Sequence, residues 1–574
     1  MISALDAVLV SALLVALISG RVPISAAFMV FILAVLVTGR ISVSQGLQLL
    51  GDPATVAVIC LVLFSNVLGR LAWLRTLLFD RHQHGVRRTL LRFLSVTGLV
   101  SAVLPNTAVV GAFMGPAARR ADISAHQLLM PLSYMALAGG MVTHFGTTAN
   151  LMVVGQAEKY GIELTSFQFM PIGAAVMVAV LVILVIFSPI LLRAPEQSGN
   201  AHVELFHVEA RVTPGSPLVG RTLIENKLRN LGHFYVAELI RDDHIFSPVG
   251  PYEPLNENDV LIFVGDVRYI EEISSLPGLE IEHEARPRPK QNIYHAVVSA
   301  SSTLAGTNLK EARFRGRFDA SVFAVRRGNE RLSGKLGEIR LKGGDLLVLA
   351  AGSDFHARDD VRANLHIVDV EDPGQSKLTR ASTIFVSLLF LAFVAVALTE
   401  VINFTLATLL LLSIGFFGGF LNLRDLRRSF PFELVVALWG SLMLGTVIAT
   451  SGMASVAATW IVSSVSSAPP FAVLIVVFVF TWLLTEMLSN TSAALAALPV
   501  ALQVAKQMGV APEALALTVA FGASASFLLP FGYQTHLMVM SPGNYQTLDF
   551  IKLGSIVLLC YAAVALTMIH WLYF

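Results

Sequence analysis

The stretch LLTEMLSNTSAALAALPV (483–500) places the triplet Ser489-Asn490-Thr491 in the middle of an otherwise apolar run, with Glu486 shortly before it. Lipid cannot hydrate such side chains, so polar groups at membrane depth face other protein groups or a wet cavity. One such triplet is commonly only a contact between helices. A second copy elsewhere in the chain would indicate a functional site.

The composition identifies the class of protein. Of 574 residues, 55% are hydrophobic and only 14% are charged, which is outside the soluble range and predicts a polytopic helical membrane protein. The net charge of +1 argues against a nucleic-acid partner. Cys60 and Cys560 both lie in apolar runs, which excludes a disulfide framework or a cysteine metal site.

Hydrophobicity is uneven along the chain. Apolar runs of membrane length fill residues 1–193 and 379–574, while the intervening residues alternate short strands with Gly and Pro turns. We therefore predict two membrane halves separated by a soluble α+β insert with lobes at 200–283 and 284–372. The first run, 4–19, lacks a basic leader and a cleavage site, so we expect a retained helix. The predicted spans are 4–19, 22–39, 54–79, 124–153, 170–192, 380–398, 402–421, 432–450, 512–540 and 551–573.

Two segments do not read as simple spans. Residues 87–120 break at Pro105 and carry arginines at both ends, which should both lie in the cytoplasm. Each arm is then about 12 to 15 residues, roughly half a bilayer, which predicts a re-entrant hairpin. The segment 469–506 follows the uncharged SSVSSAPP and is predicted to enter from outside. The two halves are therefore expected to be inverted repeats.

The two halves also match residue by residue. LPNTAVVGAF (104–113) resembles LSNTSAALAA (488–497). FGTTANLMVV (145–154) resembles FGYQTHLMVM (531–540), so that His536 occupies the position of Asn150. Broken helices leave N–H groups that favour anions and carbonyls that favour cations. The Asn-Thr motifs mark the tips of the two predicted hairpins. We predict a cavity between these two tips for a small anion and coupling cations.

The motifs PNT (105–107) and SNT (489–491), with their glycine-containing breaks, resemble the divalent anion/sodium symporter family over about two thirds of the chain. The resemblance implies a homodimer of elevator-type carriers that binds sodium and no organic cofactor. Pro105 stands where that family usually has serine. PFGYQTHLMVMSPGNYQ (530–546) resembles the subgroup with a soluble insert, which includes sulfate transporters, so sulfate and a four-carbon dicarboxylate both remain open.

The same resemblance assigns the site residues. One sodium site would comprise Asn106, Thr107, Gly146 and Asn150, and the other Asn490, Thr491 and the region from Ala523 to Gly532. Substrate-binding residues would be Asn106, Thr107, Thr147, Ser489, Asn490, Thr491 and Thr535.

Three ionisable residues lie near these motifs. Glu486 is an intramembrane carboxylate, for which proton coupling and a structural hydrogen bond are equally open. His536 is a candidate for binding or proton coupling. A structural hydrogen bond is expected for His144.

The insert resembles tandem TrkA C-terminal (RCK C-lobe) domains. Each copy is expected to contain a strand, a turn, a short helix starting at Thr222 or Asn308, and strands that close on a Gly-Asp turn. No glycine-rich nucleotide fingerprint precedes them. The lobes could bind a small-molecule regulator or serve only in dimerisation.

These features predict a sodium-coupled secondary transporter of a small divalent anion, not an enzyme, because no nucleophile and base constellation is present. We expect it in the bacterial inner (plasma) membrane with cytoplasmic lobes. A cation/proton antiporter and a ligand-gated channel are the alternatives.

Overall fold

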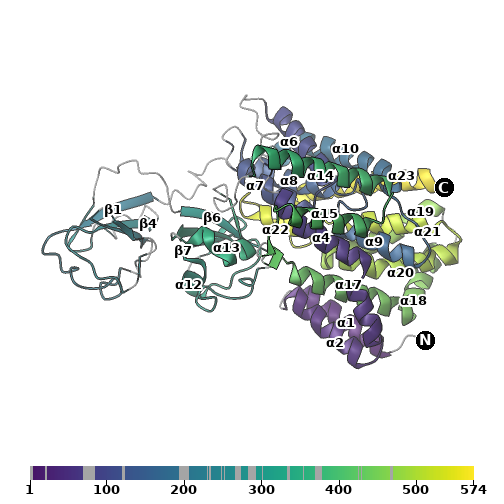
Figure 1. The fold of residues 1–574 in the computed structure, drawn as a ribbon, viewed down its shortest axis with the longest axis horizontal. Helices are drawn as coiled ribbons and strands as arrows, with labels where there is room; N and C mark the ends of the chain where they lie inside the picture. The colour runs from purple at the N-terminus through teal and green to yellow at the C-terminus, as the bar shows by residue number, and fades with distance from the viewer. Residues whose placement is uncertain are drawn as a thin grey trace. The chain divides into compact units, whose positions relative to one another are not determined.

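The computed structural model divides into two compact units, residues 1–193 with 375–574, and residues 194–374 (Figure 1). Each is described separately. The structure describes residues 4–19, 22–68, 71, 85–118, 120, 123–192, 206–228, 231, 234–242, 244–246, 249–250, 252–265, 273, 275–281, 293–299, 302–332, 336–352, 354–368, 378–423, 426–427, 430–465 and 469–574.

The first unit is helical and rich in apolar side chains. Among the described residues, six stretches are long and apolar enough to cross a bilayer, at 43–65, 166–191, 380–399, 432–450, 470–487 and 547–573. The helices of its first half are α1 (Ala4–Ser19), α2 (Ile24–Val37), α3 (Val43–Leu50), α4 (Pro53–Leu68), α6 (Val86–Ser101), α7 (Asn106–Ala118), α8 (Ala125–Gly139), α9 (Thr148–Lys159) and α10 (Ser166–Leu191). Those of its second half are α14 (Arg380–Thr399), α15 (Phe404–Phe417), α17 (Phe432–Thr450), α18 (Met453–Val465), α19 (Pro470–Met487), α20 (Asn490–Met508), α21 (Pro512–Ala523), α22 (Gln534–Met540) and α23 (Thr547–Tyr573).

Some helices differ from the predicted spans. Helices α3 and α18 were not predicted, because at 8 and 13 residues they are too short to give a membrane-length apolar run. The long runs 124–153 and 512–540 are each split into two helices, as the predicted breaks require. Most of the end of the predicted span 54–79 lies outside the described residues, as does Arg119 at the end of the first hairpin segment.

Both hairpin segments are interrupted at the Asn-Thr motifs. Helix α6 ends at Ser101 and α7 begins at Asn106, while α19 ends at Met487 and α20 begins at Asn490. Both members of each pair contact the next helix, α8 or α21. Helices α6 and α7 have 16 and 13 residues, or about 24 and 20 Å, which is less than a bilayer core of about 30 Å. Helices α19 and α20 are longer, with 18 and 19 residues, so the second segment is not built from half-length arms.

The second unit contains two five-stranded antiparallel sheets with the same topology. Their strand orders are β3-β2-β4-β1-β5 and β10-β6-β9-β7-β8. The second sheet follows the first at an interval of 86 residues, as from Phe234 to Ala320 at the starts of β2 and β7. The strands are β1 (Phe206–Val212), β2 (Phe234–Arg241), β3 (His244–Phe246), β4 (Val260–Gly265), β5 (Leu279–Ile281), β6 (Ile293–Val298), β7 (Ala320–Arg327), β8 (Glu330–Leu332), β9 (Leu346–Ala351) and β10 (Leu365–Ile367).

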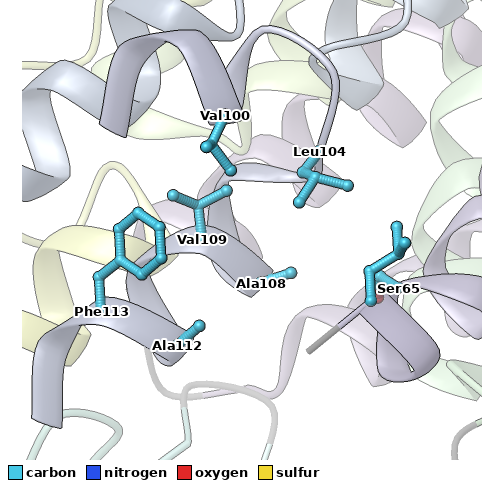
Figure 2. Close-up of a pocket in the computed structure, with 8 residues that line it drawn as sticks. Ser65, Val100, Leu104, Ala108, Val109, Ala112 and Phe113 are labelled. Atoms are coloured by element: carbon cyan, nitrogen blue, oxygen red, sulfur yellow. The ribbon is translucent and has the colours of Figure 1, made fainter. Parts of the chain in front are cut away.

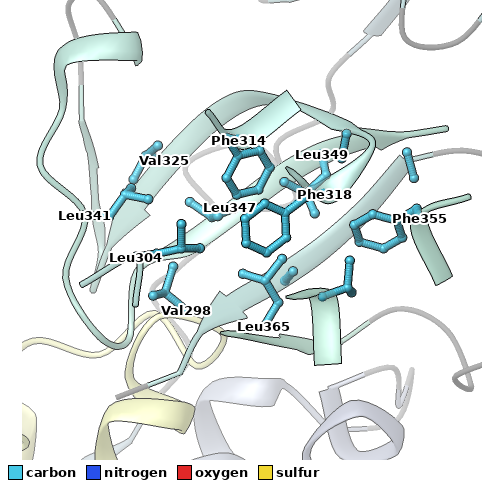
Figure 3. Close-up of a cluster of buried hydrophobic side chains, with 14 residues drawn as sticks. Val298, Leu304, Phe314, Phe318, Val325, Leu341, Leu347, Leu349, Phe355 and Leu365 are labelled. Atoms are coloured by element: carbon cyan, nitrogen blue, oxygen red, sulfur yellow. The ribbon is translucent and has the colours of Figure 1, made fainter. Parts of the chain in front are cut away.

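The short helices predicted to start at Thr222 and Asn308 are wrong. Each position begins a single turn, with Asn226 N donating to Thr222 O and Ala312 N donating to Asn308 O. The chain then adopts a positive φ, 57° at Lys227 and 47° at Arg313, which ends the turn. In the second lobe the helix comes later, at α12 (Phe314–Phe318), and its phenylalanines enter the core shown in Figure 3.

A matched ion pair fixes the same corner of each sheet. Arg241 contacts Asp259, and Arg327 contacts Asp345 at 2.7 Å. The Asp345 side chain is fully buried, and its hydrogen bonds and charge raise the pKa of Arg327. Lys342 N also donates to Asp345 Oδ2 at 2.8 Å. This carboxylate therefore holds together the turn before β9 and the end of β7.

Asp345→Ala should destabilise the second lobe, because it removes the acceptor of the Lys342 amide and leaves the Arg327 guanidinium with only the Arg340 carbonyl. Leaving these donors without the carboxylate should cost about 1 to 3 kcal/mol. Hydrogen exchange of the β7 and β9 amides in the full chain measures the loss. Asp354→Ala is the control, since its side chain is 68% exposed. Equal protection in both variants would contradict the assigned role.

Candidate functional site

At the first helix break, three oxygen atoms converge beside Asn106. Ser101 Oγ lies 2.7 Å from Asn106 Oδ1 and 2.8 Å from the carbonyl oxygen of Ala136 in α8. Ser101 and Asn106 are both buried. A serine hydroxyl therefore joins the Asn side chain at the start of α7 to the backbone of the neighbouring helix.

The second break repeats this arrangement with different residues. Thr485 Oγ1 lies 2.9 Å from Asn490 Oδ1 and 2.6 Å from the carbonyl oxygen of Ala523 at the end of α21. In both halves the hydroxyl precedes the asparagine by five residues. The motifs and the family resemblance in the sequence pointed to the two asparagines and Ala523, but not to Ser101 and Thr485. Their common spacing was the signal that could have found them.

The two halves of the membrane unit meet at these breaks. Asn106 Nδ2 donates to Tyr533 Oη at 2.8 Å, across 427 residues of sequence. Helix α22 contacts α7 and α8, and α9 contacts α20. Each Asn-bearing helix pair therefore packs against the broken helix of the other half, and a site at the tips would be assembled from both.

The first break packs closely against Asn106. A methyl group added at Gly140 would lie 2.6 Å from Asn106 Oδ1 and 2.8 Å from Thr147 Cγ2, so alanine there would require these side chains to move. Thr147 Oγ1 accepts from Asn150 N at 3.2 Å and caps α9. Asn150 Nδ2 donates to the Thr143 carbonyl at 3.2 Å, while its Oδ1 is buried without a hydrogen-bond partner. Gly146 is buried beside Gly140. A buried amide oxygen without a partner is suited to a cation ligand.

The second break is held by His536. Its Nδ1 lies 2.7 Å from Ser133 Oγ, and its Nε2 lies 2.7 Å from the carbonyl oxygen of Ser526. Ser133 Oγ also donates to Thr535 Oγ1 at 2.7 Å. His536 and Thr535 are fully buried. Both residues therefore connect α22 to Ser133 on α8 through side-chain hydrogen bonds.

The remaining predicted residues differ in exposure. Thr107 is exposed, and Ser489, Thr491 and Gly532 are half-buried. Ser489 Oγ accepts from Ser492 N at 3.3 Å and caps α20. His144 Nδ1 lies 2.5 Å from Ser166 Oγ, the structural contact expected for it.

The arrangement suits hard monovalent cations. Hydroxyl, amide and carbonyl oxygens converge at each tip, and in the described part of the chain no group of three His, Cys, Asp or Glu residues could hold a metal ion. The N-termini of α7 and α20 favour an anion nearby. The pocket in Figure 2 is a different feature, because apart from Ser65 it is lined by apolar side chains such as Val100, Leu104 and Phe113.

Comparison with known proteins identifies the family. The profile of the CitMHS citrate transporter family matches residues 14–573. The chain belongs to this family. It is 30% identical over 558 residues to an uncharacterized transporter of Synechocystis sp., covering 93% of this chain and 91% of that protein.

Two algal relatives carry more specific names. A putative sulfur deprivation response regulator of Chlamydomonas reinhardtii is 32% identical over 483 residues, 79% of this chain and 82% of that protein. Sodium/sulfate cotransporter 1 of the same alga is 26% identical over 367 residues, 61% of this chain and 41% of that protein. This member of the citrate transporter family is thus an integral membrane transporter with sodium/sulfate cotransporters among its relatives.

Gly140→Ala tests the geometry of the first tip. The added methyl group should displace Asn106 and weaken any cation site there. We expect sodium to raise the unfolding temperature of the wild-type protein and the variant to lose most of that shift. Gly85→Ala is the matched control, since a methyl group there has no neighbour within 4 Å. An unchanged sodium shift in Gly140→Ala would remove Asn106 from the cation site.

Proposed function

We propose that this transporter carries a small divalent anion, sulfate or a four-carbon dicarboxylate, together with sodium ions. The observation that carries the proposal is the matched set of hydroxyl, asparagine and carbonyl oxygens at the two tips. Two equivalent oxygen clusters fit two coupling cations of the same kind. Cation charge between the tips then offsets the charge of the anion, so that the loaded site can cross the membrane.

Sodium binding would reorganise each tip. In the structure the Ser101 and Thr485 hydroxyls bridge the oxygens that a cation would use. A bound ion replaces those hydrogen bonds with ion–oxygen contacts. On this proposal Asn106, Gly146 and Asn150 supply the first site, and Asn490 and Ala523 supply the second.

The anion would lie between the starts of α7 and α20. Free N–H groups there favour negative charge, and the hydroxyls of Thr107, Ser489 and Thr491 can donate to its oxygens. The predicted roles of Thr147 and Thr535 fit less directly, because Thr147 caps α9 and Thr535 contacts Ser133. We therefore propose that these two residues support the site rather than bind the anion directly.

Transport would follow an elevator-type alternating access in a homodimer, with the two halves as inverted repeats and the hairpins re-entrant. Ser441 on α17 contacts Ser492 on α20 at 2.8 Å, a contact that such a motion would break or shift. The two sheets of the insert would be cytoplasmic TrkA C-terminal lobes that dimerise or bind a regulator. Their equal topology supports a duplication within the insert.

Uptake into proteoliposomes tests the function. Radiolabelled sulfate, succinate and citrate are offered separately, each with a sodium or a proton gradient. We expect sulfate or succinate uptake driven by sodium. Uptake that follows only the proton gradient would contradict sodium coupling.

Two substitutions test the site. Asn106→Ala and Asn490→Ala should each reduce sodium-driven uptake by about tenfold or more, because each removes an oxygen whose loss costs at least about 1.4 kcal/mol. Thr399→Ala is the control, since this exposed hydroxyl donates to the Ala395 and Val396 carbonyl oxygens within its own helix, α14. Full uptake by both Asn variants would show that the site lies elsewhere.

A cation/proton antiporter is the second candidate. It is favoured by Glu486, a half-buried carboxylate in α19 whose Oε2 has no hydrogen-bond partner. Proton flux that does not depend on any anion would support it.

A further inference from the structure

Asp52 and Lys159 form an ion pair between two helices of the membrane unit, across 107 residues of sequence. Asp52 directly precedes α4, and Lys159 is the last residue of α9. The Asp52 side chain is 2% exposed, whereas that of Lys159 is 42% exposed. Asp52 Oδ1 also accepts from Ala54 N at 3.1 Å, and its Oδ2 contacts Lys159 Nζ. The carboxylate is therefore fixed at the start of α4, while the ammonium group reaches it from the end of α9 and stays open to water.

Helix α9 connects this ion pair to the first tip. Its first turn contains Asn150, and Thr147 caps its start. The helix has 12 residues, or about 18 Å, so the tip and the ion pair lie at opposite ends of one short rigid element. Helix α9 also contacts α20 and α21, which adjoin the second break. A displacement of α9 together with the tips would therefore move Lys159.

Asp52 belongs to a different group of helices. Helix α4 contacts α15 and α17, and α17 contacts α2. Thr405 Oγ1 in α15 donates to the Pro53 carbonyl oxygen at 2.9 Å, which holds the start of α4 in this group. The group formed by α2, α4, α15 and α17 meets the group formed by α9, α20 and α21 where α4 contacts α9 and α17 contacts α20. The ion pair therefore crosses the boundary between the two groups.

This boundary is rich in apolar and small side chains. One buried cluster contains residues from both groups, namely Ala54, Ala57, Val58, Leu151, Met152, Leu438, Leu442 and Leu495. A methyl group added at Gly155 would lie 2.8 Å from Ala54 Cβ, so α4 and α9 approach closely. Apolar burial is non-directional, whereas opposite charges attract most strongly in one position. The ion pair can therefore fix a position of α9 along α4 that apolar contact alone leaves free.

We propose that Asp52 and Lys159 form a latch, which holds α9 against α4 in the conformation of this structure and separates each time the loaded site moves. The inference rests on the proposed alternating access and adds the contact that must open. When α9 leaves, the buried Asp52 keeps the Ala54 amide but loses its counter-charge, which disfavours the movement. Binding at the tips has to offset this loss before α9 moves.

A reversible cross-link tests the latch in proteoliposomes that contain the full-length protein. Asp52→Cys and Lys159→Cys are combined, and a bismaleimide reagent with a disulfide in its spacer joins the two thiols. Cross-linking should abolish sodium-driven uptake of radiolabelled sulfate and succinate, because α9 can no longer leave α4, and reduction of the spacer should restore it. The rise in unfolding temperature caused by sodium should remain, because the cross-link leaves the tips intact.

Asp6 and Arg40 provide a matched control. Arg40 Nε lies 3.0 Å from Asp6 Oδ1, the side chains are 35% and 6% exposed, and the pair joins α1 to the residues after α2, two helices in mutual contact. The same cross-link between Asp6→Cys and Arg40→Cys should leave uptake unchanged. The single variants Asp52→Cys and Lys159→Cys, treated alike, give the effect of the reagent on separate thiols, including the two native cysteines.

The outcomes separate the latch from the transport function. Uptake that survives complete cross-linking of positions 52 and 159 would overturn the latch and leave the proposed function standing. Loss of uptake in the control pair as well would also overturn it, because the α4–α9 contact would then have no special role. If the wild-type protein takes up neither anion, both proposals fall. If Asp52→Cys does not fold, Gly51→Cys replaces it, since Gly51 is exposed and a methyl group there makes only ordinary contacts.

Discussion

The membrane unit depends on how backbone groups are satisfied where its helices break. A carbonyl or N–H group without a partner at membrane depth costs several kcal/mol, so each break requires a polar group from nearby. Ser101 and Thr485 meet this requirement in the same way, each bridging an asparagine side chain and the carbonyl of a neighbouring helix. The Asn-Thr motifs can occur in the membrane because these hydroxyls support them.

On the proposed function, the same hydrogen bonds would make the breaks responsive to ions. Ser101 Oγ carries one hydrogen and lies within hydrogen-bond distance of two acceptors, Asn106 Oδ1 and Ala136 O, so one of these oxygens is left for another donor or a cation. Asn106 also donates to Tyr533, so a change at the first tip is transmitted to the broken helix of the other half. On the proposed function, ion binding and the geometry of the first tip would be coupled by these direct contacts.

The sequence predicted the features that have a local signature. Apolar runs of membrane length predicted a helical membrane protein, and the repeated Asn-Thr motifs predicted the positions where α7 and α20 begin. It could not give the contact between Asn106 and Tyr533, because residues separated by 427 positions leave no local pattern. The helix predicted at Thr222 failed for a different reason, since a capped turn and a helix start have the same residue preferences.

The two halves are not equivalent in charge at their matched breaks. Thr485 corresponds to Ser101, so Glu486 corresponds to Ala102, a buried methyl group without charge. The first half therefore offers neutral oxygens, whereas the second offers neutral oxygens and one carboxylate.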